Sequence, residues 1–453
     1  MIFSSIQFLT VFLPIFLIVY IVSLKLFKDR VTVPNIILFL GSFVFYFYST
    51  HFYSFILIAL VLINYFLALE INYFRKNETL RTLIFILSVI INAGVLVGYK
   101  ISGNGSMVGV GFYTLYLISY MADVYTKKTK AEKNIVKVMT FSVLFTKLMQ
   151  GPIARYANAQ FALTKRNISI TRFDRGLKLF VFGMAMKVCL ADKLGTLWLE
   201  LQKIGYDSIS TPLAWLGALT YSLQLYFDFR GYSIMAMGLG DMIGIRMPSN
   251  FDEPYASKSI TDFYRRWHMS LGNWFRDYIY IPLGGNRKGK LRSYINIFIV
   301  WLLTSFWHGV SAHYFIWGMS LCTLIIIEKL FLKKLLDKSK IISHIYIIFF
   351  ITLSWVAFAI EDLTQLKMYF SRLFPFLFKM EAYNIQNEDF IRYFKTYAPL
   401  LLVSVIMCIP FVSKYLVTMR KKWWSGFLAL ILFVVSLYYV ALGSNNPFMY
   451  LNF

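Results

Sequence analysis

Long apolar runs recur along the whole chain and are separated by short polar segments. Each run has about 17 to 20 residues, the length that a helix needs to cross a hydrocarbon core of roughly 30 Å. Helices are expected because they satisfy every backbone polar group inside lipid. The pattern predicts an all-α membrane protein with about eleven to twelve transmembrane helices, at residues 6–24, 33–50, 55–74, 82–99, 107–125, 177–195, 213–229, 294–311, 313–331, 341–360, 397–416 and 425–441.

Two stretches depart from this pattern. Residues 135–155 are apolar but short, and they contain Lys147 and Pro152, which favours a re-entrant or interfacial segment over a full crossing. Residues 246–292 mix aromatic and basic side chains at helical spacing. Such a stretch is typical of a helix that lies in the membrane interface with a cationic face.

The composition agrees with a membrane protein. Of the 453 residues, 58% are hydrophobic and only 15% are charged, against about 25% charged in soluble domains. Residues 1–7 carry no Lys or Arg ahead of the first apolar run, which favours a retained first span over a cleaved signal. Cys189, Cys322 and Cys408 lie in apolar segments without paired spacing, and we interpret them as packing residues.

The basic residues gather on every second connection between the apolar runs. The formal net charge is +24, and the clusters lie near 25–30, 75–81, 127–133, 165–175, 246–292, 333–340 and 420–422. Cytoplasmic loops carry such an excess of Lys and Arg. The pattern predicts a multi-pass protein of the cell membrane with both termini extracytoplasmic. It explains the charge better than nucleic-acid binding does, so we expect membrane lipids and no nucleic acid as partners.

Polar groups inside apolar segments are the first candidates for chemistry. His308 lies well inside the run that begins near 294, and an ionisable residue at that depth is a functional-site hypothesis by default. His268 lies on the presumed interfacial helix, where a structural and a catalytic role are equally plausible. Asp228 is an intramembrane acid with Arg230 close by, so an ion pair is the simpler interpretation. The other three histidines are interpreted as residues of span ends and loops.

Long ordered blocks of sequence then narrow the interpretation. They are Met1-Ile2-Phe3-Ser4-Ser5, Phe112-Tyr113-Thr114, Gly151-Pro152-Ile153-Ala154-Arg155-Tyr156, Leu190-Ala191-Asp192, Arg265-Arg266-Trp267-His268-Met269-Ser270-Leu271, Trp274-Phe275-Arg276-Asp277-Tyr278, Ile281-Pro282-Leu283-Gly284-Gly285-Asn286-Arg287, Trp307-His308-Gly309 and Asn446-Pro447-Phe448. Together they resemble the membrane-bound O-acyltransferase (MBOAT) superfamily and, within it, the bacterial alginate O-acetylation (AlgI-like) subgroup. One departure is Gly109-Val110-Gly111, which stands where a Pro-Ile-Gly-Ile-Ser lead-in is usual and bears on the local turn, not on the chemistry.

The resemblance implies a fold and a catalytic centre. The MBOAT fold is a ring of tilted helices around a central tunnel, with one histidine inside that His308 matches; His268 matches the second polar site residue of the family. The chain would then be a single integral membrane domain, 1–453, with N-terminal helices at 1–130, a catalytic core at about 135–332 and C-terminal helices at 341–453.

The implied activity is O-acetyl transfer, with His308 as the general base that takes the proton of the attacking hydroxyl. The expected donor is a cytoplasmic thioester such as acetyl-CoA, whose phosphates basic side chains can hold; no bound cofactor and no metal are expected. The candidate donor- and substrate-binding residues are Arg265, Arg266, Arg276, Arg287, Asp228 and Trp307.

The resembled subgroup delivers the acyl group outward. The expected partners are therefore a separate extracytoplasmic acetyltransferase and a polysaccharide acceptor in the envelope of a bacterial cell. Two alternatives stay open: a D-alanyl transfer protein of teichoic acid synthesis in the same superfamily, and a non-enzymatic polysaccharide exporter. The sequence leaves undecided which glycan is modified, whether acetyl reaches it directly, and the oligomeric state.

Overall fold

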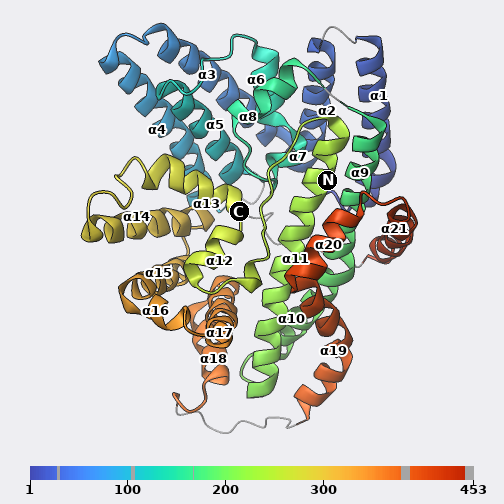
Figure 1. Cartoon of the computed structure of the whole chain (residues 1–453), viewed down its shortest axis with the longest axis vertical. Coiled ribbons are helices and arrows are strands. Elements are labelled where there is room, and N and C mark those ends of the chain that lie inside the picture. The colour runs from blue at the N-terminus through green and yellow to red at the C-terminus, as the bar shows by residue number, and fades with distance from the viewer. Residues whose placement is uncertain (28–30, 104–107, 167, 379–387, 444–453) are drawn as a thin grey trace.

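The computed structural model describes residues 1–27, 31–103, 108–166, 168–378 and 388–443, and all regular secondary structure in these ranges is helical (Figure 1). The all-α prediction is therefore confirmed. The block Asn446-Pro447-Phe448 and part of the basic cluster 25–30 lie outside the described residues.

The helices follow one another along the chain as η1 (Phe8–Phe12), α1 (Leu13–Leu26), α2 (Thr32–Thr50), η2 (His51–Tyr53), α3 (Ser54–Tyr73), α4 (Glu78–Ser102), α5 (Val110–Tyr125), α6 (Ile135–Val143), α7 (Phe145–Leu148), α8 (Tyr156–Thr164), α9 (Ile170–Ala185), η3 (Met186–Ala191), α10 (Asp192–Ile204), α11 (Thr211–Ile243), η4 (Pro254–Ala256), α12 (Ile260–Arg266), α13 (Met269–Phe275), η5 (Arg276–Tyr280), α14 (Lys290–His308), α15 (Ala312–Ile327), η6 (Glu328–Leu332), α16 (Lys333–Leu336), α17 (Lys340–Ala359), α18 (Leu363–Leu373), α19 (Asp389–Cys408), α20 (Pro410–Met419) and α21 (Ser425–Ala441).

Six helical segments of the described chain are long and apolar enough to cross a membrane. They are Phe8–Leu26, Thr32–Tyr73 (which contains α2 and α3), Glu78–Ser102, Ala312–Leu336, Lys340–Ala359 and Asp389–Cys408. Helix α4 is buried over only 11% of its apolar window, so most of its apolar surface is left for lipid. The chain is thus a multi-pass membrane protein, while the count of eleven to twelve crossings stays a prediction.

Helix α11 runs through the centre of the molecule (Figure 1) and is longer than the predicted span 213–229. It has 33 residues and ends only at Gly244, whose left-handed φ of 81° caps it. The polar residues after position 229 do not end the helix because most of the helix is buried against protein, where polar groups find partners. The predicted end at 229 was therefore wrong.

Small residues bring α9 and α11 together. A Cβ built on Gly183 would lie 2.5 Å from the carbonyl oxygen of Gly231, and one on Gly231 would lie 2.7 Å from that of Gly183. Gly176 and Gly238 face each other in the same way. The two backbones thus approach as closely as small-residue contacts between membrane helices allow.

The predicted interfacial stretch 246–292 is not one helix. The chain forms the short helices α12 and α13, and between them His268 adopts a left-handed conformation with φ of 44°. Such a residue interrupts a right-handed helix. In the stretch 135–155, α6 and α7 are likewise short, and neither could cross a membrane, in agreement with the sequence.

The predicted span 397–416 is also broken. Helix α19 begins at Asp389, and Ile409 leaves the helical region with ψ of 125° immediately before Pro410 starts α20. Proline disfavours the helical conformation in the residue before it and cannot donate a backbone hydrogen bond. Helix α18, in the predicted loop 361–395, was not expected from the sequence.

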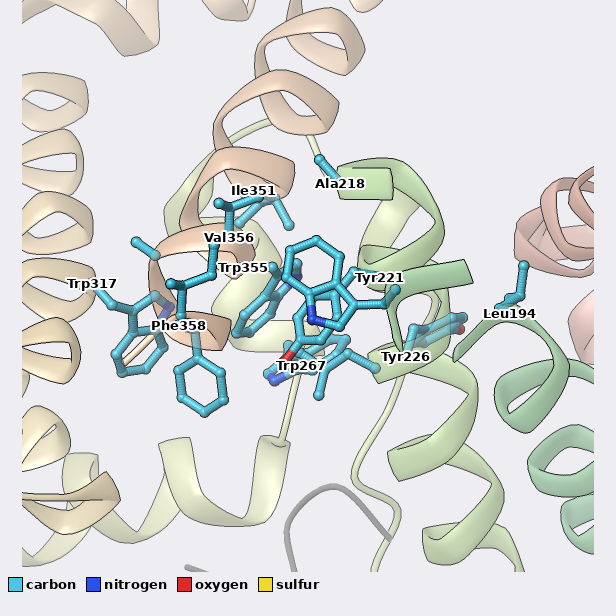
Figure 2. Packing of buried hydrophobic residues seen from close by; sticks show 14 of the residues in the cluster. Leu194, Ala218, Tyr221, Tyr226, Trp267, Trp317, Ile351, Trp355, Val356 and Phe358 are labelled. Carbon is cyan, nitrogen blue, oxygen red and sulfur yellow. The ribbon is translucent and has the colours of Figure 1, made fainter. Parts of the chain in front are cut away.

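Aromatic side chains from α11, α12, α15 and α17 pack into one cluster (Figure 2). The rings of Trp267 and Trp355 lie 4.9 Å apart, centroid to centroid, and Trp317 packs 5.1 Å from Phe358. Cys322 is buried in this core, as predicted for a packing residue. Trp267, Trp317 and Trp355 of this cluster form part of the wall of the cavity that contains His268 and His308.

Candidate active site

A cavity of about 310 Å³ opens between α12, α13, α14, α15 and α17. We call it the histidine cavity, because both sequence-predicted catalytic histidines line it. Its walls are mainly apolar and aromatic. The lining residues are Thr261, Tyr264, Arg265, Trp267, His268, Leu271, Gly272, Phe275, Arg276, Tyr280, Ile297, Val300, Trp301, Thr304, His308, Trp317, Ile325, Lys329 and Trp355.

His308 is the last residue of α14 and is buried. Its imidazole packs edge-on against Trp317 and Phe358, at centroid distances of 5.0 and 5.1 Å. Its carbonyl oxygen accepts a hydrogen bond of 2.9 Å from Nζ of Lys100, at the end of α4. The ring is thus held by aromatic neighbours while its backbone is anchored to an N-terminal helix.

His268 enters the cavity from the break between α12 and α13. Its Nδ1 lies 3.4 Å from Oδ1 of Asn250, and the same oxygen accepts a hydrogen bond of 3.2 Å from the backbone N–H of Ser270. Because that N–H identifies the amide oxygen, Nδ1 of His268 must carry the proton and donate it. Nε2 then keeps its lone pair, and it has no hydrogen-bond partner among the described residues although it is buried. The arrangement leaves a basic nitrogen available to a bound molecule.

Trp307 lies between the two histidines but does not line the cavity. Its ring centroid is 4.8 Å from that of His308 and 6.2 Å from that of His268. Its indole N–H donates a hydrogen bond of 2.9 Å to the carbonyl oxygen of Gly111. This placement supports the geometry of both imidazoles rather than a direct contact with substrate.

Gly109 and Gly111 stand where the chain departs from the usual family sequence, and close contacts explain why these positions are glycine. Gly109 has φ of +84°, and a Cβ there would lie 2.5 Å from the carbonyl oxygen of Leu148. A Cβ on Gly111 would lie 3.0 Å from Nε1 of Trp307. Gly109 therefore lets the turn before α5 pass the Leu148 carbonyl, and Gly111 in the first turn of α5 leaves room for the Trp307 indole.

Three cationic side chains line the cavity on its exposed side. Arg265 and Arg276 were predicted from the sequence, whereas Lys329 was missed. A lysine inside the apolar run 313–331 was the feature that could have indicated it. Arg266 forms an ion pair of 3.1 Å with Asp262 instead, and neither Arg266 nor Arg287 lines the cavity.

Asp228 lies elsewhere, and its expected pairing was wrong. The carboxylate forms an ion pair of 3.0 Å with Lys187, not with Arg230. Arg230 pairs with Glu253 at 3.1 Å. All four side chains are buried, and Asp228 does not line the histidine cavity. Both ion pairs belong to the interior of the bundle around α11, where a buried charge without a partner would destabilise the fold.

A helical membrane bundle with two buried histidines in a cavity whose rim is cationic is suited to group transfer from an anionic donor. The family comparison agrees: the model described as MBOAT, membrane-bound O-acyltransferase family, matches residues 38–366. The chain belongs to this family and is an O-acyltransferase.

Individual relatives give a finer comparison. The probable alginate O-acetylase AlgI of Pseudomonas fluorescens is 35% identical over 384 residues, which cover 83% of this chain and 76% of that protein. The peptidoglycan O-acetyltransferase of Helicobacter pylori is 27% identical over 526 residues, covering 100% of this chain and 98% of that protein. The teichoic acid D-alanyltransferase of Bacillus subtilis is 30% identical over 226 residues, covering 47% of this chain and 56% of that protein.

Proposed function

We propose that this O-acyltransferase moves acetyl from cytoplasmic acetyl-CoA across the membrane for O-acetylation of an extracellular polysaccharide. The observation that carries the proposal is the placement of His308 and His268 in one cavity beside Arg265, Arg276 and Lys329. The names of the AlgI and peptidoglycan relatives favour acetyl as the group and a glycan as the acceptor.

The cationic residues hold the donor. The phosphates of coenzyme A are too polar to enter the apolar cavity, so they stay at its exposed side, where Arg265, Arg276 and Lys329 bind them by charge-assisted hydrogen bonds. The acetyl thioester then extends past the tryptophans toward His308. Water is poorly accommodated between these aromatic walls, which limits hydrolysis of the thioester.

The two histidines carry the transfer. His308 accepts the proton of the attacking hydroxyl while its oxygen adds to the thioester carbonyl. The tetrahedral intermediate expels the thiolate, which recovers the proton from the imidazolium, so the products are an acetyl ester and free coenzyme A. General base catalysis of this kind contributes about 10²–10⁴ in rate. His268, through the lone pair on Nε2, accepts a hydrogen bond from the hydroxyl and orients it.

The direction of transfer follows from charge. The basic connections are cytoplasmic by the positive-inside rule, so donor binding is cytoplasmic and both termini are extracytoplasmic. The hydroxyl that attacks belongs to the exported glycan or to an extracytoplasmic partner acetyltransferase that passes the group on.

The proposal is tested by His308→Ala in cells that make the envelope polysaccharide, with His344→Ala as the control because His344 lies outside the histidine cavity. We expect labelled acetate to disappear from the secreted polysaccharide in His308→Ala and to remain in the control, with equal amounts of folded protein and polysaccharide in both. Acetylation that survives in His308→Ala would refute the mechanism.

Two further readouts separate the alternatives. Loss of D-alanine label from the envelope would favour D-alanyl transfer, for which the similarity to the Bacillus subtilis relative over 47% of this chain is the specific reason. A variant that stops secreting polysaccharide, but still acetylates what remains, would favour an exporter.

A further inference from the structure

A second cavity, of about 690 Å³, lies at the ends of α8, α9, α11 and α20. It shares no lining residue with the histidine cavity. In Figure 1, α1, α9 and α21 lie at one side of the molecule, whereas α13, α14 and α15 lie at the other. We call this second space the cation pocket, because its charged lining residues are Lys165, Arg172, Arg175, Arg246, Arg420, Lys421 and a single acid, Asp241.

The single acid cannot neutralise so many cations. Asp241 pairs with Nε of Arg172 at 3.3 Å and reaches Arg420 only at 4.0 Å. In the part of the chain that the structure describes, the side chains of Arg175, Arg246 and Lys421 form no hydrogen bond or ion pair. The pocket therefore holds an excess of positive charge that folding alone does not explain.

Arg420 shows the cost of this crowding. Its Nε and Nη1 atoms are buried without a hydrogen-bond partner among the described residues. Burial lowers the pKa of its guanidinium, Asp241 opposes that change, and repulsion from Arg175 and Arg246 lowers the pKa further. A bound anion would satisfy the buried N–H groups and relieve the repulsion.

An apolar groove adjoins the cation pocket. The groove has a volume of about 590 Å³ and shares Lys165 and Ser169 with the pocket. Its other lining residues come from α1, from positions 27 and 31 between α1 and α2, from the connection that precedes α9, and from the first turn of α9. They are mainly apolar: Ile21, Leu24, Phe27, Val31, Ile168, Ile170 and Phe173, with Lys25 and Arg166. A cationic pocket and an apolar groove thus adjoin at one edge of the bundle. Two exposed aromatic residues belong to the same region: Phe161 lines the cation pocket, and Trp423 follows its lining residue Lys421 in the sequence.

We propose that the cation pocket and the adjoining groove together bind an anionic phospholipid. The phosphate headgroup lies among Arg175, Arg246 and Arg420, and an acyl chain lies along the groove beside Ile170. Basic pockets between membrane helices recognise such headgroups, and a soluble phosphate compound would leave the groove unfilled. All the cations belong to the basic clusters 165–175, 246–292 and 420–422, so the lipid belongs to the leaflet on that side of the membrane.

The test uses the purified full chain in detergent, titrated with lipids and followed by native mass spectrometry. Phosphatidylglycerol is compared with phosphatidylcholine of the same acyl chains and with glycerol phosphate. We expect phosphatidylglycerol to bind at least tenfold more tightly than phosphatidylcholine and glycerol phosphate to bind weakly. Glycerol phosphate that binds as tightly as phosphatidylglycerol would assign the pocket to a soluble anion and overturn the proposal.

Variants locate the binding. The double variant Arg175→Gln, Arg246→Gln removes two cations without breaking an ion pair. Each basic residue near an anionic lipid raises the binding affinity about fivefold, so loss of both should weaken phosphatidylglycerol binding about thirtyfold. The matched control is Lys334→Gln, Lys338→Gln, which loses the same charge at exposed positions of another basic connection and should bind like the original chain.

A third variant tests the groove. Ile170 is exposed at the first position of α9, so Ile170→Glu is compatible with the helix dipole and should not disturb folding. Its carboxylate would repel the lipid, and we expect weaker phosphatidylglycerol binding. Unchanged phosphatidylglycerol affinity in both the double variant and Ile170→Glu, with elution as folded protein, would overturn the proposal.

Discussion

The contact between α9 and α11 makes a sharp prediction about how packing supports the active site. In Gly183→Ala, the added methyl group would lie 2.5 Å from the carbonyl oxygen of Gly231 and 2.8 Å from the backbone nitrogen of Met235. Both are backbone atoms that cannot rotate away. Because non-bonded heavy atoms need about 3.5 Å, the two helices must separate locally by about 1 Å.

The energetic cost follows from two opposing effects. Overpacking of this kind costs about 1–3 kcal/mol, whereas replacing glycine by alanine inside a helix returns about 0.5–1 kcal/mol. We therefore expect a net loss of about 1–2 kcal/mol in the free energy of unfolding. The matched control is Gly98→Ala in α4, where no heavy atom lies within 4 Å of the added methyl group. There the helix effect acts alone and stability should rise.

The same change should reduce activity. Gly231 is two residues after Phe229, whose ring packs edge-on against His268 at a centroid distance of 4.7 Å. A displacement of about 1 Å at a catalytic group can cost about 10² in rate. Unfolding in detergent and acetyl transfer are measured on both variants. If Gly183→Ala proves as stable and as active as Gly98→Ala, the close approach of the two helices and its link to His268 are refuted.

Three further predictions concern single polar groups. Asn250→Leu should lower kcat about tenfold, because it removes one hydrogen bond to His268. Asn250→Asp keeps the acceptor oxygen, so its kcat should fall less. Equal losses of kcat in steady-state kinetics would contradict the assigned tautomer of His268. Lys329→Gln should raise KM for acetyl-CoA about tenfold with little change in kcat, and the difference should shrink at high salt. Lys187→Met leaves the buried carboxylates of Asp192 and Asp228 without their cation, so the folded yield in size-exclusion chromatography should collapse, for a cost of about 3–5 kcal/mol.

Lipid-facing helices were predictable from the sequence because their apolar length is a direct consequence of the bilayer. The spans at 33–50 and 55–74 agree with α2 and α3 to within a residue or two. Breaks inside the apolar stretches were not predictable from hydropathy alone. The interruption at Ile409 depends on Pro410, and the one at His268 depends on a left-handed conformation that only the surrounding packing maintains.

The site divides in the same way. His308 could be singled out because an imidazole at that depth in an apolar run has few structural explanations. Lys329 left one signal, a lysine inside an apolar run, whereas Trp355 left none, since it reaches the cavity from a helix that is separated in the sequence from the histidine blocks. The pairing of Asp228 was also out of reach: Arg230 is its neighbour in sequence, but two residues along a helix point to different sides, and Lys187 arrives from η3.

The central helix explains why hydropathy failed in this part of the chain. Helix α11 is the longest helix among the described residues but is not among the segments apolar enough to count as membrane spans. Its surroundings are protein, so it can carry Asp228 and Arg230, provided that Lys187 and Glu253 meet them. The glycines that admit α9 and the phenylalanine that packs on His268 lie on this same helix. Helix α11 therefore holds its neighbours and supports the His268 ring with polar and small residues that a lipid-facing span would not carry.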